Sequence, residues 1–448
     1  MSTIAILGTG MAAVGAYSRL RDEPHRCVLY DKNSYAGGHT VTFRHPDGFS
    51  FDSGPHVSFT KDQRIQQLLA DAVDGKYEAV QYQLNNYWQG YWFAHPVQCH
   101  LHGLPADLVT RILLSFIEEE RKPLPEVTNY AEWLVASYGQ VLAETFPMAY
   151  TAKYHTTPAE NLRTDWMGPR MYRPTLQEIV FGALSPTVPH VHYITNFRYP
   201  TSGGFQSYVD GLRAGAAIEL GHELVALDPS RQELTFRNGR RLTYAAVISS
   251  IALPDLVPMI AGVPQEVRAA AATLACSSVV LVNVGLDRSD VSKAHISYFY
   301  DADVIFSRLS FPHMFSPNMA PAGCGSIQAE VYFSNKYKPL DRTPEECVEP
   351  VIRDLRRVGL IRETDRILHR SVAFAEYANI IFDHDRPPAL ATVHGYLDSI
   401  GVHYCGRYGD WAYLWTDDSF KSGERAAESA LARLERSAGI GRPTEDVG

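Results

Sequence analysis

Two glycines near the N-terminus could hold the phosphates of a dinucleotide. Gly8 and Gly10 follow the apolar run Ile4-Ala5-Ile6-Leu7. A pyrophosphate lying across a helix N-terminus needs backbone N–H groups with no Cβ atom in the way. Ala13 takes the third position of the fingerprint, where alanine is allowed. Asp31 comes 21 residues after Gly10 (31 − 10), where an acid accepts hydrogen bonds from ribose hydroxyls. An acid there disfavours a 2′-phosphate, so the spacing predicts a site for FAD or NAD rather than NADP.

The elements around this turn have the pattern of a βαβ unit. We expect a buried strand over Thr3–Gly8, a helix over Met11–Arg21, and a second strand over Cys27–Tyr30 that Asp31 closes. A glycine-rich turn alone is a weak signal, because such turns are common. Here the strand before it, the helix after it and the acid all agree, which favours a dinucleotide site over a plain structural turn.

Farther along the chain, hydrophobic periodicity predicts helices and then strands. Helical patterns dominate from about residue 61 to 173 and include a helix over Tyr130–Phe146. Strands are predicted within Ile218–Ile251 and at Val279–Leu286 and Ser326–Phe333. An amphipathic helix is expected over Ser419–Arg436. These elements predict an α/β protein.

Two later segments bear on whether the dinucleotide is NAD or FAD. A second glycine turn, Ala36-Gly37-Gly38-His39, follows closely enough to pass the phosphates and ribityl chain of a flavin cofactor. Near the C-terminus, Gly406-Arg407-Tyr408-Gly409 and Tyr413 lead to Asp417 at the start of the last helix. A helix N-terminus beside a strand is a second site for an anion or a polar ring edge.

Composition argues against several classes of function. The 448 residues include 41 Lys and Arg against 50 Asp and Glu, a formal net charge of −9, whereas nucleic-acid-binding domains are usually basic. No apolar run reaches the roughly 18 to 20 residues that span a bilayer. The six cysteines have no CxxC spacing, which argues against a zinc site and a disulfide framework. We expect no metal, no nucleic-acid partner, no membrane segment and no Ser-His-Asp set, in a reducing cytoplasm.

In their order along the chain, the motifs resemble the FAD-dependent superfamily that includes amine oxidases and protoporphyrinogen oxidase. Within it they most resemble UDP-galactopyranose mutases of the eukaryotic type. Phe51–Val57 resembles the segment with a histidine beside the flavin, and Phe197–Gly204 resembles a Phe-Arg-aromatic-Pro turn that ends in Gly-Gly. Phe306-Ser307-Arg308 and Glu330-Val331 keep the order around a phosphate-binding arginine. Gly406–Tyr413 resembles the segment with the flavin-binding arginine.

This resemblance implies an enzyme that interconverts the pyranose and furanose forms of a nucleotide sugar. In that reaction reduced FAD attacks the anomeric carbon through N5 and displaces the nucleoside diphosphate. The sugar then opens and recloses as a furanose. The cofactor supplies the nucleophile and the protein supplies placement. NAD(P)H would serve as a transient reductant.

The resemblance also implies roles for individual residues. His56, Arg170 and Arg308 are assigned to catalysis, with His56 beside the flavin and the arginines on the diphosphate, because arginine is always charged and bidentate. Substrate contacts are assigned to Gln98, Lys153, Tyr377 and Tyr413. Cofactor contacts are assigned to Gly8, Gly10, Ala13, Asp31, Gly37, Gly38, His39, Gly54, Val225, Gly406, Arg407 and Asp417.

The expected architecture has two lobes. A Rossmann-like, discontinuous FAD-binding domain takes residues 1–60, 200–265 and 395–440. The mixed substrate lobe has a helical region, 61–199, and a β-sheet region, 266–394, and residues 441–448 form a tail.

Two alternative functions stay open. The first is an amine oxidase-like FAD-dependent oxidoreductase, an oxidase or dehydrogenase that acts on a C–N or C–O bond of a small molecule. The second is a flavin-binding protein without turnover. Phe315 stands where the mutases have a tyrosine, and Trp415-Thr416-Asp417-Asp418 replaces their Asn-Gln-Asp-His run. Because of these replacements, the oxidoreductase hypothesis stays open.

Overall fold

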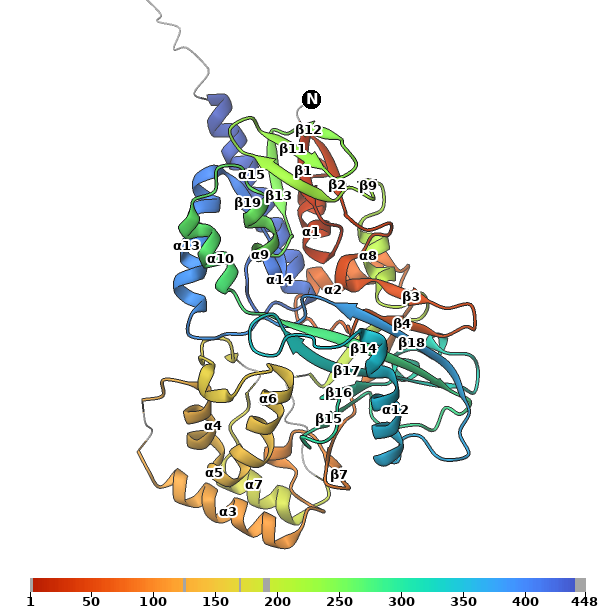
Figure 1. Cartoon of the computed structure of the whole chain (residues 1–448). Helices are drawn as coiled ribbons and strands as arrows, with labels where there is room; N and C mark the ends of the chain where they lie inside the picture. The colour runs from red at the N-terminus through yellow and green to blue at the C-terminus, as the bar shows by residue number, and fades with distance from the viewer. Residues whose placement is uncertain (1–2, 124–125, 169–170, 188–193, 440–448) are drawn as a thin grey trace, which may run out of the picture.

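The computed structural model describes residues 3–123, 126–168, 171–187 and 194–439. A parallel sheet with its helices lies at one end of the molecule, a larger sheet crosses the middle, and a group of helices lies at the other end (Figure 1). The α/β fold class predicted from the sequence is confirmed. The exact domain boundaries remain a prediction.

The parallel sheet carries the glycine turn. Its five strands lie in the order β19-β13-β1-β2-β9, and each neighbouring pair is parallel. The strands are β1 (Thr3–Leu7), β2 (Arg26–Tyr30), β9 (Ala217–Glu219), β13 (Ala246–Ser249) and β19 (Val402–Tyr404). The β1–α1–β2 unit therefore forms as predicted, with α1 spanning Met11–Leu20.

Two helices cross closely on this sheet. The long C-terminal helix α15 (Thr416–Gly439) packs along α1. A Cβ atom on Gly15 would collide with the carbonyl of Phe420, and one on Gly423 would collide with the carbonyl of Ala12. Glycine is needed at both positions because the two backbones touch. Nearby lie α2 (Gln63–Ala72), α8 (Gln206–Leu212) and α14 (Gly406–Gly409).

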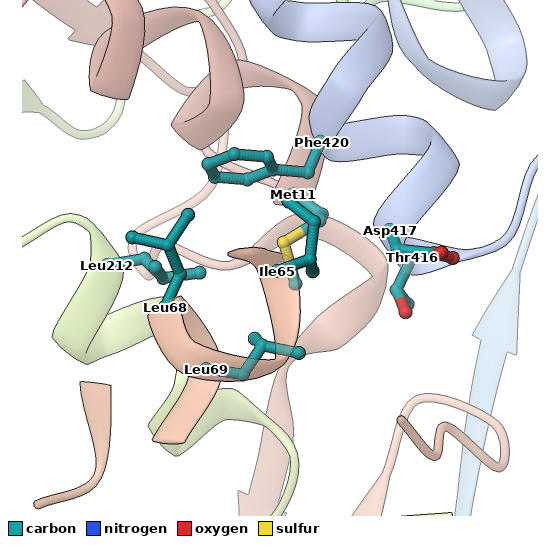
Figure 2. Close-up of a pocket in the computed structure, with 8 residues that line it drawn as sticks. All are labelled: Met11, Ile65, Leu68, Leu69, Leu212, Thr416, Asp417 and Phe420. Atoms are coloured by element: carbon teal, nitrogen blue, oxygen red, sulfur yellow. The ribbon is translucent and has the colours of Figure 1, made fainter. Parts of the chain in front are cut away.

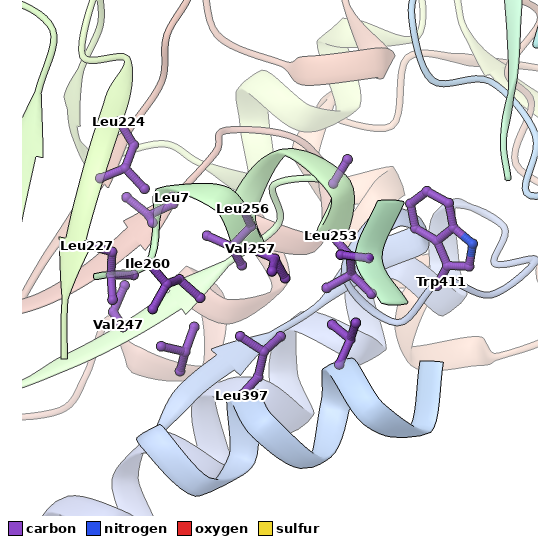
Figure 3. Close-up of a cluster of buried hydrophobic side chains, with 14 of the residues drawn as sticks. Leu7, Leu224, Leu227, Val247, Leu253, Leu256, Val257, Ile260, Leu397 and Trp411 are labelled. Atoms are coloured by element: carbon purple, nitrogen blue, oxygen red, sulfur yellow. The ribbon is translucent and has the colours of Figure 1, made fainter. Parts of the chain in front are cut away.

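The other face of the parallel sheet buries the largest apolar cluster (Figure 3). Leu7 and Val247 from the sheet meet Leu253, Leu256 and other side chains there. The surrounding elements are α9 (Leu253–Leu256), α10 (Gln265–Thr273), α13 (Arg386–Ile400) and the antiparallel strands β10 (Leu224–Asp228), β11 (Glu233–Phe236) and β12 (Arg241–Thr243).

The middle sheet has seven strands in the order β18-β14-β17-β16-β15-β6-β7. They are β6 (Leu84–Trp88), β7 (Tyr91–Ala94), β14 (Ser277–Leu286), β15 (Ile296–Phe299), β16 (Arg308–Ser310), β17 (Gly325–Ser334) and β18 (Ile367–Ala375). Both ten-residue strands, β14 and β17, are buried throughout and include the strands predicted at Val279–Leu286 and Ser326–Phe333.

The remaining elements are a group of helices and several short helices and strands. The helical group at the far end consists of α3 (Ala106–Glu120), α4 (Tyr130–Tyr138), α5 (Gln140–Ala143), α6 (Ala149–Tyr154) and α7 (Leu176–Leu184). Two short helices, α11 (Pro312–Phe315) and α12 (Val348–Arg357), pack beside the middle sheet. Two separate pairs of strands are β3 (Thr42–Arg44) with β4 (Ser50–Asp52), and β5 (Tyr77–Gln81) with β8 (Asn196–Pro200).

The expectation that helices dominate from 61 to 173 is wrong over Tyr77–Ala94, which forms β5, β6 and β7. The segment is rich in tyrosine and tryptophan, which favour strands. Gly90 has a φ of 89° in the turn between β6 and β7, where only glycine is unstrained. Because β6 pairs with β15 in parallel register, this segment extends the middle sheet.

The helix predicted over Tyr130–Phe146 is two helices, α4 and α5, separated at Gly139. Gly139 has a φ of 73°, and a Cβ atom there would lie 2.7 Å from the backbone nitrogen of Phe116. The neighbouring α3 thus passes so closely that the chain must turn at a glycine.

Candidate functional site

A cavity of about 1060 Å³ lies between the parallel sheet and the middle sheet. It is lined by residues from both sheets and from the segments around Gly406 and Trp415. Thirteen of the nineteen predicted site residues line it: Gly8, Gly10, Asp31, Gly38, His39, Gly54, His56, Val225, Arg308, Tyr377, Gly406, Arg407 and Tyr413. Residues that lie far apart in the sequence therefore converge on one cavity.

At one end of the cavity, the N-terminus of α1 is open to a ligand. Gly10 caps the helix without any side-chain hydrogen bond, and the first turn contains no acid. The first backbone N–H groups of a helix have no partner within it and carry its positive dipole end. Gly8 has a φ of 116°, and a Cβ atom there would collide with the Ser250 hydroxyl. This end of the cavity fits a pyrophosphate.

The second glycine turn lies directly against the first. A Cβ atom on Gly38 would lie 3.1 Å from the Cα of Gly10. Thr9 links Asp31 to the second glycine turn, because its hydroxyl donates to Asp31 and accepts from the Gly37 N–H at 3.0 Å. Asp31 is also held by the N–H groups of Asn33. The turn and the acid thus form one rigid cradle, and its chemistry fits a dinucleotide.

At the other end of the cavity, Arg308 forms an ion pair with Glu330. The Nε atom of Arg308 lies 2.9 and 3.0 Å from the two Glu330 oxygens, and the Glu330 side chain is 1 % exposed. Tyr332 donates its hydroxyl to the same carboxylate. The guanidinium carbon lies 5.8 Å from the ring centre of Tyr154. Both bonds to Glu330 use Nε, so the Nη groups of Arg308 are not committed to this carboxylate.

The sequence motifs did not identify Glu330 and its aromatic neighbours as site residues. The signal was an acid within a strand whose ten residues are otherwise uncharged, Gly325–Ser334. A buried carboxylate in such a strand needs a cationic or hydrogen-bonding partner. The sequence could indicate that a partner exists, but only the pairing of β16 with β17 identifies it as Arg308.

His56 faces the cavity as a neutral imidazole. Its Nδ1 lies 2.9 Å from the carbonyl oxygen of Gly54, so Nδ1 donates a proton and Nε2 is an acceptor. Burial lowers the pKa of His56 to about 4, and the nearby charges of Arg407 and Arg308 act in the same direction. Burial likewise lowers the pKa of His39 to about 3. Both histidines are therefore uncharged at neutral pH.

Arg407, Tyr377 and Tyr413 line the cavity, but their polar atoms also contact other groups of the protein. Arg407 donates to the carbonyl oxygens of Leu414 at 2.7 and 3.0 Å and of Ala378 at 3.1 Å. The Tyr377 hydroxyl donates to Asp255 at 2.6 Å, which raises the Tyr377 pKa further after burial has done so. The Tyr413 hydroxyl lies 3.4 Å from that of Tyr154.

Five predicted site residues lie outside the lining of this cavity. Ala13 is fully buried in the face of α1 that packs on the sheet, and Gly37 lies behind Thr9. Gln98 donates to the Tyr172 carbonyl oxygen at 3.2 Å. Lys153 donates to backbone carbonyls, and burial lowers its pKa to about 7. Asp417 lies at the edge of a small apolar pocket of about 10 Å³ between α1, α2 and α15 (Figure 2). Arg170 lies outside the described residues.

A serine, a histidine and an aspartate do meet in the structure, contrary to the expectation from sequence. His369 lies 2.7 Å from an Asp47 oxygen through Nδ1 and 2.8 Å from the Ser371 hydroxyl through Nε2. Asn283 also donates to Ser371 at 3.2 Å. None of these residues lines the cavity. The bonds join the turn between β3 and β4 to the edge strand β18.

Among the residues that the structure describes, no helix is long and apolar enough to cross a membrane. Nor does this part of the chain contain a group of three or more His, Cys, Asp or Glu residues placed to hold a metal ion.

Comparison with known proteins identifies the family. A model described as flavin containing amine oxidoreductase matches residues 14–431. The chain therefore belongs to the family of flavin-containing amine oxidoreductases, and membership implies FAD as the cofactor. The glycine cradle and the open helix N-terminus fit that cofactor.

Solved structures share the whole fold. The chain is similar to reduced UDP-galactopyranose mutase, with a TM-score of 0.90 and 24% identity over 97% of this chain and 96% of that one. It is also similar to a putative protoporphyrinogen oxidase from Exiguobacterium sp. 255-15, with a TM-score of 0.74 and 16% identity over 96% and 99% of the two chains. At these identities the likeness shows the fold, and the reaction has to be argued from the site.

A curated relative matches only a short segment. A 4,4'-diapophytoene desaturase from Staphylococcus haemolyticus is 36% identical over 59 residues. The match spans 13% of this chain and 12% of the desaturase.

Three histidines predict a loss of stability in acid: His155, which is buried, and His39 and His56, which are half-buried at the cavity. A histidine in the unfolded chain has a pKa of about 6.5, whereas burial lowers the pKa values of His39, His56 and His155 to about 3, 4 and 4. The unfolded state therefore binds more protons between pH 6.5 and 4, and the free energy of unfolding falls as the pH falls through this range. Asp52 acts oppositely, because burial raises its pKa to about 6 and the folded state protonates it first.

The three histidines outweigh Asp52, and His295 and His403, whose pKa values burial also lowers to about 4, act in the same direction as the three. We expect denaturant titrations of the flavin-loaded protein to give a free energy of unfolding roughly 2–5 kcal/mol lower at pH 5 than at pH 7, at about 1.4 kcal/mol per unit of pKa shift. An equal or higher free energy at pH 5 would contradict the assignment of neutral buried imidazoles.

Proposed function

We propose that the protein is a flavoenzyme that interconverts the pyranose and furanose forms of a nucleotide sugar. The observation that carries the proposal is the placement of Arg308 in the same cavity as the glycine cradle. One end of this cavity suits the pyrophosphate of FAD, and the other offers a guanidinium to the diphosphate of a substrate. The fold shared over nearly the whole chain with a UDP-galactopyranose mutase supports the proposal.

The parallel-sheet end of the cavity would hold the cofactor. The N–H groups at the start of α1 and the turn at Gly8 and Gly10 would bind its pyrophosphate. The carboxylate of Asp31 would accept hydrogen bonds from the ribose. When bound, reduced FAD supplies the nucleophile for the anomeric carbon, and NAD(P)H would act as the transient reductant.

The middle-sheet end would hold the substrate. Glu330 fixes the Nε side of Arg308, and the Nη side would meet the phosphate oxygens, which match a guanidinium in geometry and charge. The hydroxyl of Tyr413 would add a neutral donor, and Arg170 is proposed as a second cation from the sequence resemblance. His56 presents a neutral Nε2 acceptor to the cavity, so it can take a hydrogen bond without adding charge.

Product analysis tests this proposal. The enzyme, reduced with dithionite under anaerobic conditions, is incubated with UDP-, dTDP- and GDP-linked hexoses and deoxyhexoses, and the products are identified by NMR. We expect one nucleotide sugar to give its furanose isomer, with the flavin still reduced at the end. A panel that returns unchanged from the reduced enzyme would count against the mutase reaction.

The charge of the cavity favours a second candidate, an oxidoreductase that acts on an amine. The charged lining residues are five acids, Asp31, Glu223, Asp255, Glu330 and Glu376, and three cations, Lys32, Arg308 and Arg407. The described lining is thus negative before an anionic cofactor binds, which suits a cationic substrate better than a dianionic one. Reduction of the oxidised flavin by an amine, with peroxide formed in air, would support this candidate over the mutase.

We also propose that the protein works in the cytoplasm. All six cysteines are free in the structure, and four of them are buried. Unpaired cysteines are typical of a reducing compartment.

A further inference from the structure

The ammonium group of Lys153 donates all its hydrogen bonds to backbone carbonyl oxygens in the connection between β15 and β16. The Nζ atom donates to the carbonyl oxygens of Phe306 at 2.7 Å, Asp301 at 2.8 Å and Phe299 at 3.3 Å. An ammonium group has three N–H donors and no acceptor. All three are occupied, so Lys153 has no donor left for a substrate.

The three carbonyl groups span the connection between β15 and β16. Phe299 is the last residue of β15, and Phe306 comes two residues before Arg308, the first residue of β16. The connection also lies against β17, because the Ser307 N–H donates to the Glu330 carbonyl oxygen at 3.0 Å. Lys153 thus holds together the two ends of the loop that precedes Arg308.

Lys153 belongs to the short helix α6, which also surrounds Arg308 with aromatic rings. Tyr154, the next residue, lies under the guanidinium with its ring centre 5.8 Å away. Tyr150, one turn earlier, packs on Tyr154 and on Tyr298, with ring centres 5.3 and 5.6 Å apart. Lys153, Tyr154 and Tyr150 all belong to α6. The same helix therefore contacts the loop before Arg308 and supplies aromatic rings beside the guanidinium.

We propose that Lys153 is a positioning residue that fixes Arg308 through the β15–β16 connection. This replaces a direct contact between Lys153 and the substrate. The inference rests on the proposed function in one respect, that Arg308 binds a diphosphate. Without the ammonium group, the carbonyl oxygens of Phe299, Asp301 and Phe306 lose the donor that joins them, and the loop can move the guanidinium away from its place.

UDP binding tests the role of Lys153. Calorimetric titration compares the flavin-loaded wild type with Lys153→Met and with the control Lys338→Met. Lys338 is a nearby lysine whose Nζ lies over the Phe333 ring, 5.1 Å from its centre. We expect K153M to weaken UDP binding on the order of 10- to 100-fold, as small misplacements of a binding group do, and K338M to change it less than about twofold.

A double-mutant cycle separates positioning from general damage. If Lys153 acts through Arg308, K153M should change UDP affinity less than about twofold in an Arg308→Ala background. The same large loss in both backgrounds would overturn the proposal. Lys153→Gln, which keeps two N–H donors without the charge, replaces K153M in the cycle if the methionine variant does not fold.

Crystal structures of the flavin-loaded wild type and K153M answer the question without any nucleotide. We expect the Arg308 guanidinium to leave its wild-type position in K153M while the parallel sheet superposes. An Arg308–Glu330 pair that superposes in both structures would overturn the positioning role. A wild type that binds no nucleoside diphosphate refutes the proposed function instead, and the structures still decide the role of Lys153.

Discussion

Replacing Arg308 with alanine is expected to weaken UDP binding by roughly 10- to 150-fold and to leave the flavin spectrum unchanged. A hydrogen bond between charged partners contributes about 1.5–3 kcal/mol, and Arg308 lies at the opposite end of the cavity from the glycine cradle. Titration of the oxidised flavoprotein with UDP, dTDP and GDP measures the effect. Unchanged affinity for all three nucleotides would remove Arg308 from the substrate site.

A control is needed because alanine leaves Glu330 buried and unpaired, which is strongly destabilising in itself. The double variant R308M/E330Q removes both charges and preserves most of the volume. It should fold and keep its flavin, yet lose UDP affinity as R308A does. If the double variant binds UDP like the wild type, the loss in R308A reflects the orphaned carboxylate and not a contact with phosphate.

Gly10→Val is expected to abolish flavin binding while the protein stays folded. A Cβ atom on Gly10 would meet no protein atom closer than 3.6 Å, and the φ of Gly10 is −78°, so the backbone there accepts a Cβ atom without strain. The branched side chain would instead project where the pyrophosphate approaches α1. Absorbance of the purified protein measures bound flavin, and circular dichroism measures folding.

Gly8→Ala provides the contrasting variant. At Gly8 the positive φ and the Ser250 hydroxyl both exclude a side chain, so this change should lower the melting temperature whether or not flavin is present. A yellow G10V protein with normal flavin content would show that the cofactor does not approach this turn.

Local patterns predicted the βαβ unit around the first glycine turn well. The strand, glycine turn, helix and acid over residues 3–31 lie close together in sequence, and each has a recognisable pattern of its own. The strands β5 and β6 were missed because their partners β8 and β15 lie more than a hundred residues away. The strands β6 and β7 also form a local hairpin, whose signal, the turn at Gly90, was overlooked. The break at Gly139 depends on the backbone of α3, which no pattern within Tyr130–Phe146 reveals.

Side-chain partners were the harder part of the site. The sequence motifs predicted that Arg308 binds phosphate, but its ion pair with Glu330 follows from the register of β16 against β17. Lys153 and Gln98 matched family motifs, yet their polar atoms bind backbone carbonyl oxygens outside the cavity lining. His369 and Ser371 are two residues apart, but Asp47, which completes the set, is supplied by a distant hairpin. Such partners follow from tertiary packing alone.

The most direct test of the account is the dependence of turnover on the redox state of the flavin. The enzyme is titrated anaerobically from fully oxidised to fully reduced with dithionite, and each sample receives the nucleotide sugar that gave a furanose product. We expect the rate to rise in proportion to the reduced fraction and the flavin to be still reduced at the end. Turnover by the oxidised enzyme, with one flavin reduced for each substrate consumed, would contradict it and identify an oxidoreductase.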